Sequence, residues 1–211
     1  MKNKKIKSIV VMTIAVFVFA YTLPAVAEEM AQTMPPGMDE EMMAKMKEFS
    51  TPGENHQVLD YFVGDWAYTA KFWMSPDAPP EESAGTSSTQ WIMDGRFIEQ
   101  AFVGAFMGSP FNGKMTMGFD NLKKMYVSTW IDDMSTGIMT SEATYDAASQ
   151  SFTEHGSHSC PIDGTRHFRA IIKIIDKNTY SYITTIIGKD GSETPGMEIL
   201  YTRNASNSQT L

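Results

Sequence analysis

The chain has 211 residues, of which 42% are hydrophobic and 20% charged, and its formal net charge is −8. This length suits one domain with a sizeable core, and the single cysteine excludes an internal disulfide, so stability must come from packing. The acidic balance argues against nucleic acid as a partner, because a polyanion is repelled by such a surface.

The first 27 residues read as a cleavable export signal. An apolar run over residues 9–20 and the segment Leu23-Pro24-Ala25-Val26-Ala27 follow a charged start. That start contains Lys2, Lys4, Lys5 and Lys7. Charge, apolar run and a small-x-small site together are the secretory pattern. The run is shorter than the about 20 residues of a spanning helix, so we expect no stable membrane anchor.

We therefore expect cleavage near Ala27 and a mature chain, residues 28–211, that works in the periplasm or outside the cell. Loss of the four lysines lowers the formal net charge from −8 to −12. Such acidity helps to keep an exported protein in solution.

Residues 28–50 are expected to form a flexible leader and a Met-rich helix. Met38, Met42 and Met46 are four residues apart and share one helical face. We interpret this face as an adaptable apolar surface that packs on the core. The alternative is a copper site, since thioethers are soft ligands for Cu(I), although no His or Cys joins the stripe.

A second short helix is predicted after residue 50. Thr51 can cap it, Pro52 fits its first position and Glu54 completes a capping box. Val58, Leu59 and Phe62 supply its apolar face, and Gly64 ends it.

From Asp65 onward the apolar pattern has a period of two, which indicates strands. Turn residues such as Asp94-Gly95, Asp120-Asn121 and Asp190-Gly191 separate the extended runs. The runs are 66–74, 84–93, 96–106, 113–119, 124–132, 137–145, 151–156, 166–175, 179–187 and 195–203.

These runs predict a mainly β fold, a single antiparallel meander barrel of about 8–10 strands preceded by two short N-terminal helices. Closure into a barrel is the simplest way for so long a meander to hide its edges. The barrel domain is expected over residues 51–203, and residues 204–211 are expected to be a disordered tail.

Several segments of this domain resemble a bacterial family defined only as domain of unknown function 1579. The longest is residues 118–138, which includes Gly118-Phe119-Asp120-Asn121-Leu122-Lys123-Lys124. Shorter ones are Thr51-Pro52-Gly53-Glu54 with His56, Gly64-Asp65-Trp66, Gly95-Arg96-Phe97, Pro110-Phe111 with Gly113, Met197-Glu198-Ile199 and Tyr201-Thr202-Arg203. The resemblance implies a calycin-type barrel, related in shape to lipocalins, and no established activity.

The lipocalin-like shape also implies a structural closure at one end of the barrel. In such barrels a Trp of the first strand is covered by a late Arg, and here Trp66 opens the first run while Arg203 ends the last. A guanidinium over an indole contributes about 0.5–2 kcal/mol. The alternative is that Trp66 belongs only to the core and Arg203 only to a solvated strand end.

Six residues are candidates for ligand binding. In the run 124–132, one parity has the side chains of Tyr126, Trp130 and Asp132, together with Ser128, and would line an interior pocket. On the neighbouring hairpin, Trp91, Arg96 and Glu99 are the further candidates. Arg96 and Glu99 have opposite parity and can both point inward only if Gly95 bulges the chain. The alternative is that this parity faces solvent and that Glu99 forms a surface ion pair.

No motif requires catalysis, a metal or a cofactor. The four histidines are His56, His155, His158 and His167, and only His155-x-x-His158 has a spacing that could suit a ligand pair. Without a third ligand we expect neither a metal nor haem. Cys160 lies in an expected turn and is interpreted as a structural thiol.

The leading functional hypothesis is an exported, lipocalin-like, ligand-binding barrel that holds a small apolar or amphipathic molecule inside. One alternative is an enzyme that acts on a small molecule in the same cavity, with Glu99, Asp132 or His56 as acid or base. The other is a partner-binding module with a filled barrel. The residues leave the identity of the ligand and the oligomeric state open.

Overall fold

A computed structural model describes residues 39–162 and 164–204. The expected signal peptide, most of the leader with Met38, and the tail after residue 204 lie outside these residues. The chain divides into two units, Met1–Met42 and Met43–Leu211. The barrel belongs to the second unit.

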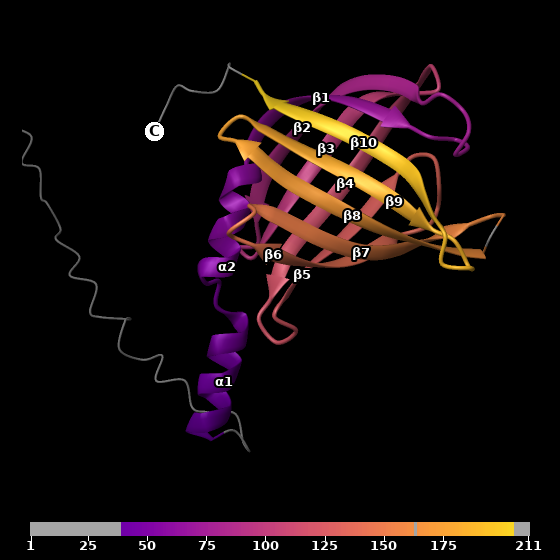
Figure 1. Cartoon of the computed structure of the whole chain (residues 1–211). Coiled ribbons are helices and arrows are strands. Elements are labelled where there is room, and N and C mark those ends of the chain that lie inside the picture. Colours follow the sequence, from indigo (N-terminus) through magenta and orange to yellow (C-terminus); the bar gives the residue numbers. More distant parts are fainter. Residues whose placement is uncertain (1–38, 163, 205–211) are drawn as a thin grey trace, which may run out of the picture. The chain divides into compact units, whose positions relative to one another are not determined.

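Ten antiparallel strands close into a barrel in which each strand pairs with its sequence neighbours and β1 pairs with β10 (Figure 1). The predicted fold class is thereby confirmed, with ten strands in the meander. The strands are β1 (Gly64–Phe72), β2 (Glu81–Ile92), β3 (Phe97–Phe106), β4 (Ser109–Asp120), β5 (Met125–Asp132), β6 (Met139–Asp146), β7 (Ser151–Cys160), β8 (Gly164–Asp176), β9 (Thr179–Ile187) and β10 (Glu193–Arg203).

The alternation of apolar and polar residues sets the inside and outside of the barrel. In β8, Phe168, Ala170, Ile172 and Ile174 are buried, and Lys173 between them is exposed. Successive side chains of a strand point to opposite faces, so one parity of each strand faces the interior. The same rule holds in β3, where Ile98, Gln100 and Phe102 are the buried residues.

Three short helical segments precede the strands: α1 (Glu40–Ser50), α2 (Glu54–Gln57) and the 3₁₀ helix η1 (Val58–Phe62). The predicted packing of a Met face on the core is wrong for the described part of the stripe, because α1 has no buried residue and Met46 is 50% exposed. The residues that fill the core at this end are instead Leu59 and Phe62 of η1. The copper alternative stays a prediction.

Thr51 does not cap α2 as the sequence predicts. Its hydroxyl donates to the carbonyl of Lys47 at 2.6 Å and so satisfies the end of α1. α2 begins after Gly53, whose N–H donates to Nδ1 of His56 at 3.0 Å. A His side chain therefore takes the capping role that the sequence assigned to Glu54.

Arg203 and Trp66 lie together at the end of the barrel that η1 covers. The guanidinium carbon of Arg203 is 4.0 Å from the centroid of the indole ring, and the same side chain donates to the carbonyls of Val63 at 2.7 Å and Tyr61 at 2.6 Å. The indole is fully buried and donates to the carbonyl of Phe62 at 2.9 Å. One cation thus joins the last strand, the first strand and the 3₁₀ helix, and we call this group the basal plug.

Candidate ligand-binding cavity

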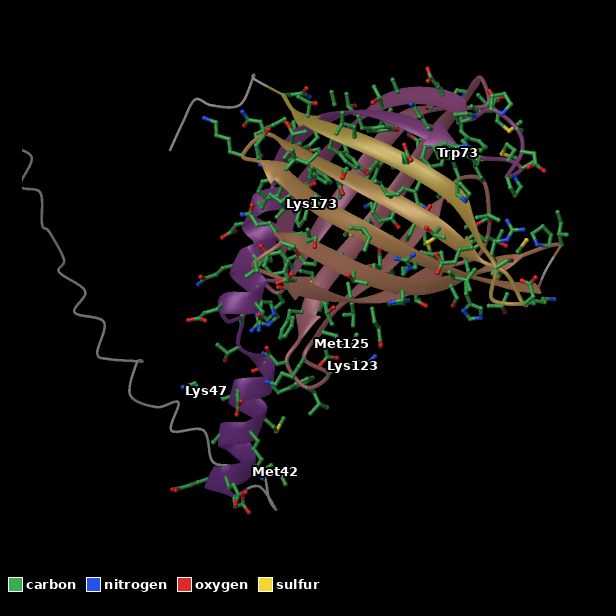
Figure 2. All side chains as sticks on the ribbon, in the orientation of Figure 1. Met42, Lys47, Trp73, Lys123, Met125 and Lys173 are labelled. Atoms are coloured by element: carbon green, nitrogen blue, oxygen red, sulfur yellow. The ribbon has the colours of Figure 1, made fainter. Side chains whose placement is uncertain are left out.

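The barrel encloses a cavity of about 500 Å³. It reaches solvent at the end opposite the basal plug, where the lining residues Met74 and Met134 are 63% and 58% exposed. Figure 2 labels Trp73, a lining residue, at this open end, and Lys173 towards the plugged end. The sheet thus forms a container with one sealed end and one open end.

The walls of the cavity are mostly apolar and aromatic. Phe102 from β3 packs against Trp130 from β5 and Tyr68 from β1, with ring centroids 5.0 and 5.9 Å apart. Thioethers line the wall between the rings, from Met115, Met117, Met139 and Met197. Such a wall is typical of sites that hold a small apolar molecule.

One polar group lies deep in the cavity, on β3. The amide nitrogen of Gln100 donates to the Ser87 hydroxyl at 2.9 Å and to the Tyr180 hydroxyl at 3.0 Å. Tyr180 stacks on Tyr201 with ring centroids 4.1 Å apart. Burial raises the pKa of Tyr180, so its phenol stays neutral near pH 7.

A second polar group surrounds Glu154 on the opposite part of the wall. The carboxyl oxygen Oε1 accepts from the hydroxyl of Ser141 and from that of Ser128 at 3.3 Å, and the Tyr182 hydroxyl also interacts with the carboxyl group. The other oxygen, Oε2, is buried and has no hydrogen-bond partner among the residues that the structure describes. Burial raises the pKa of Glu154, although the hydroxyl donors oppose this shift.

Charged and ionisable side chains line the cavity nearer its open end. Asp132 accepts from Nε1 of Trp130 at 2.8 Å and from two backbone N–H groups of the following loop. His158 and Arg166 are opposite each other on β7 and β8. Burial and the guanidinium of Arg166 lower the pKa of His158, and Asp132 acts in the other direction. An imidazole in this setting is mostly neutral at pH 7.

Four of the six predicted ligand-binding residues lie on the inside of the barrel, and two of those line the cavity. Trp130 and Asp132 are the lining residues. Tyr126 and Trp91 lie near the basal plug instead, where they donate to the carbonyl of Asn55 at 2.9 Å and to the carboxylate of Asp60 at 2.7 Å. Burial raises the pKa of Tyr126 to about 12.

The other two predicted residues do not face the cavity. Glu99 is on the outer parity of β3 and forms an ion pair with Lys114 at 3.2 Å. Arg96 precedes β3 in the turn and donates to the carbonyls of Ser50 and Met93, both at 3.1 Å. The β2–β3 pairing runs without a bulge, so Gly95 does not turn both side chains inward.

Sequence reasoning missed Gln100 and Glu154, and it considered His158 only as a metal or haem ligand. Gln100 stands between Ile98 and Phe102 on a buried parity, and Glu154 and His158 share a parity with Phe152. A polar residue on an inward parity was therefore the available signal. His56, which the sequence offered as an acid or base, is buried beside Phe119 with ring centroids 5.9 Å apart and does not line the cavity.

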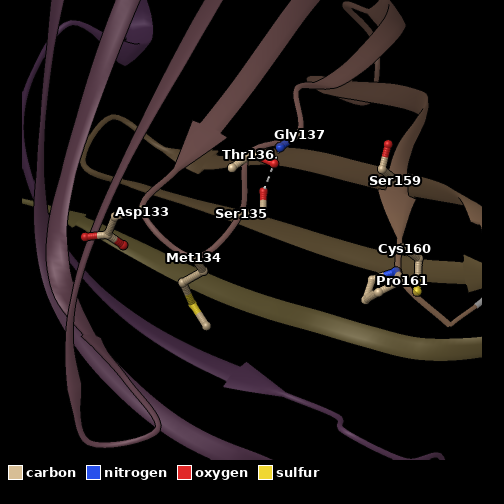
Figure 3. Close-up of a pocket in the computed structure, with 8 residues that line it drawn as sticks. All are labelled: Asp133, Met134, Ser135, Thr136, Gly137, Ser159, Cys160 and Pro161. Atoms are coloured by element: carbon tan, nitrogen blue, oxygen red, sulfur yellow. Dashed lines mark hydrogen bonds between the residues drawn. The ribbon is translucent and has the colours of Figure 1, made fainter.

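A second hollow, of about 580 Å³, lies on the surface between two loops (Figure 3). Residues 133–137 form one side, where the Gly137 N–H donates to the Ser135 hydroxyl at 3.3 Å, and residues 159–161 form the other. Cys160 lies here, at the end of β7. This hollow is far more open than the interior cavity and has fewer apolar walls.

The described residues contain neither a cluster of metal ligands nor a helix that could cross a membrane. No cluster of three or more His, Cys, Asp and Glu side chains within residues 39–162 and 164–204 could hold a metal ion. In the same ranges, no helix combines the length and the hydropathy that crossing a membrane requires.

Comparisons with known proteins give one family match and two structural neighbours of low sequence identity. The family described as "Protein of unknown function (DUF1579)" matches residues 51–203. The crystal structure of Rv2717c from M. tuberculosis is 13% identical, with a TM-score of 0.53 over 73% of this chain and 99% of that chain. A de novo designed fluorescence-activating β-barrel is 15% identical, with a TM-score of 0.39 over 70% of this chain and 97% of that one. Among curated proteins, none matches this sequence.

Proposed function

Because this chain belongs to DUF1579, a family of proteins of unknown function, we propose its function from the cavity itself: the barrel binds one small apolar or amphipathic molecule in its interior. The observation that carries this proposal is the cavity of about 500 Å³, which is walled by aromatic rings and thioethers. Binding gains about 25 cal/mol for each Å² of apolar surface removed from water, before the cost of immobilising the ligand.

The acid and base candidates from the sequence do not come together in the cavity. Of the three residues that the sequence offers as acid or base, Asp132 lines the cavity, whereas Glu99 is outside and His56 is packed elsewhere. Asp132 is already engaged by Trp130 and by the backbone of the next loop. A filled barrel that only docks a partner does not fit the open interior.

We further propose that the protein is exported and acts in the periplasm or outside the cell. The support is the charged, apolar and small-residue pattern of residues 1–27. N-terminal sequencing of the protein from its own host should read from Glu28. A chain that begins at Met1 in an extracytoplasmic fraction would contradict the cleavage.

The binding proposal is tested by native mass spectrometry of protein purified from its own host. We expect one co-purified small molecule per chain. The same preparation, once stripped, should bind the neutral dye 6-propionyl-2-(dimethylamino)naphthalene at a 1:1 ratio. Absence of both would contradict the proposal.

Two neighbouring residues of β9 provide a matched pair of variants. Thr184 lines the cavity, whereas the adjacent Ile183 is on the outer parity and 43% exposed. Thr184→Phe should fill part of the cavity and weaken dye binding at least about tenfold, since it removes the space for the ligand. Ile183→Phe should leave binding unchanged. Equal effects of both changes would mean that the dye binds outside the barrel.

A further inference from the structure

The group around Glu154 is asymmetric. Two serine hydroxyls serve Oε1: Ser141 donates to it, and Ser128 is 2.5 Å from the Ser141 hydroxyl and 3.3 Å from Oε1. The Tyr182 hydroxyl also interacts with the carboxyl group. Glu154 as a whole is 5% exposed, and its Oε2 meets no partner among the described residues. One oxygen is therefore saturated and the other is unsatisfied.

The hydrogens available to this group can be counted. Each hydroxyl has one hydrogen to donate. Ser141 donates to Oε1. Ser128 donates to Ser141 or, at 3.3 Å, to Oε1. Because both serine hydrogens are used in this way, neither is left for Oε2, which has no partner among the described residues.

Glu154 lines the cavity, but Oε2 has almost no accessible surface, so the carboxyl group must turn about its last side-chain bond for this oxygen to meet a ligand. A buried polar group without a partner is uncommon in folded proteins and calls for an explanation. If the acid is neutral, Oε1 acts as the carbonyl oxygen and Oε2 carries the proton. Oε2 is then a hydrogen-bond donor without an acceptor.

We propose that the Oε2 hydroxyl of Glu154 is the polar anchor of the cavity, and that it donates a hydrogen bond to a carbonyl oxygen of an otherwise apolar ligand. This inference rests on the proposed function. It adds to that function the chemical class of the ligand: a neutral, apolar molecule with a ketone, aldehyde or ester group.

The surroundings favour the neutral acid over a carboxylate that binds a cation. Burial disfavours the ionised form, and the neighbours that contact the carboxyl group are hydroxyls without charge. The ionisable groups that affect it are Tyr182, whose phenol is neutral, and His155, whose effect is the smallest of the causes. A ligand ammonium here would lose its water and gain only one free oxygen as a partner.

The test uses three probes that share a naphthalene ring and a two-carbon substituent. They are 2-acetylnaphthalene, which has a carbonyl acceptor, 2-ethylnaphthalene, which has no polar group, and 1-(2-naphthyl)ethylamine, which is a cation at pH 7. Binding of each to the stripped full-length mature protein is measured by isothermal titration calorimetry. The variants are Glu154→Gln and Glu154→Met.

We expect Glu154→Met to weaken binding of 2-acetylnaphthalene about tenfold, and to leave the affinity for 2-ethylnaphthalene unchanged or higher. Glu154→Gln should change the affinity for the ketone by less than about threefold. The reason is that its amide N–H replaces the carboxyl O–H and its carbonyl accepts from the same hydroxyls. If Glu154→Met does not fold, the Glu154→Gln variant alone separates a neutral anchor from a carboxylate that binds a cation. A neutral anchor keeps its affinity for the ketone in this variant, whereas a carboxylate site loses its affinity for the amine because the amide has no charge.

Three outcomes would overturn the inference. If the amine binds most tightly and Glu154→Gln abolishes its binding, the anchor is a carboxylate for a cation. If Glu154→Met affects the ketone and the hydrocarbon equally, Glu154 acts only through packing, and the binding function stands without the anchor. If none of the three probes binds to the wild-type protein, the proposed function itself fails, and the anchor with it.

Discussion

Individual residues in this barrel depart from the apolar pattern around them, and Glu154 is the clearest case. Its carboxyl group is in the interior, where the neutral form is favoured and the pKa is raised by burial. The folded protein therefore holds a proton on this group at pH values where the unfolded chain has released it. The stability that this proton contributes is fully present below pH 4.5, the ordinary pKa of a Glu side chain. It is lost as the pH rises through the raised pKa of the folded protein.

Glu154→Gln should consequently stabilise the protein at pH 8 and have little effect at pH 4. The amide does not titrate and keeps an acceptor for Ser141. We expect a gain of about 1 kcal/mol at pH 8, equivalent to about 2–4 °C in Tm for a chain of this size. Thermal unfolding followed by circular dichroism at both pH values measures the difference.

The control for this variant is Glu142→Gln. Glu142 is 45% exposed in its side chain and pairs with Lys123 on the surface. Its replacement should change stability by less than about 1 kcal/mol at either pH. A Glu154→Gln protein that is less stable than wild type at pH 8 would show that the ionised carboxylate is the native form.

Arg203 is the second residue whose single change should have a large effect. Arg203→Ala removes the cation over Trp66 and leaves the carbonyls of Val63 and Tyr61 without their donor. We expect a loss of about 2–4 kcal/mol in the free energy of unfolding, measured by urea denaturation. Arg203→Lys should lose less, because an ammonium can still serve one carbonyl.

Arg169→Ala provides the comparison for the Arg203 variants. Arg169 pairs with Glu193 at 2.7 Å, but both side chains are partly exposed to water. A surface ion pair of this kind contributes about 0–1 kcal/mol. Equal losses in Arg169→Ala and Arg203→Ala would mean that the basal plug does not stabilise the barrel.

At the scale of the strands, two glycines create the room for an aromatic side chain. Gly85 on β2 and Gly104 on β3 are paired in register, and a Cβ on either would overlap the Tyr68 hydroxyl. Gly104 has no other neighbour closer than the Ala84 carbonyl at 3.2 Å. The sheet therefore admits the Tyr68 ring because these two positions have no side chain.

Gly104→Ala should destabilise the protein by about 1–3 kcal/mol through this overlap. In a Tyr68→Phe background, which lacks the hydroxyl, the same change should cost much less, and a double-mutant cycle measures the difference. Gly137→Ala is the control, since its nearest neighbour would be 3.7 Å away. Additive effects of Gly104→Ala and Tyr68→Phe would contradict this account.

The strands could be predicted from the sequence because their alternation is strong, whereas the site could be predicted only in part. Trp130 and Asp132 were predicted because they are large or charged residues on one parity. Glu99 lies outside the cavity, and the sequence could not show this because parity alone does not say which face of β3 is inside. Ile98 is fully buried, so its parity is the inner one and Glu99 lies on the outer one. Which parity faces the interior depends on how all ten strands close, and a local pattern does not contain this information.

For the molecule as a whole, the folded unit is expected to begin near Met43. The chain divides between Met42 and Met43, and α1 has no buried residue among those described. A chain that starts at Met43 should therefore unfold at the same temperature, within about 2–4 °C, as one that starts at Glu28, because burial of apolar surface dominates stability. A larger fall in Tm, measured side by side, would show that residues 28–42 support the barrel.

The basal plug links residues that are far apart in the chain. Arg203 donates to carbonyls 140 and 142 positions earlier, and β10 supplies one edge of β1. These contacts cannot form before β10 is in place beside β1. Closure of the barrel therefore depends on its most distant pair of strands, and folding that depends on such distant contacts is slow. A meander in which β10 has not yet paired has two unpaired edge strands, and such edges are sites at which chains aggregate.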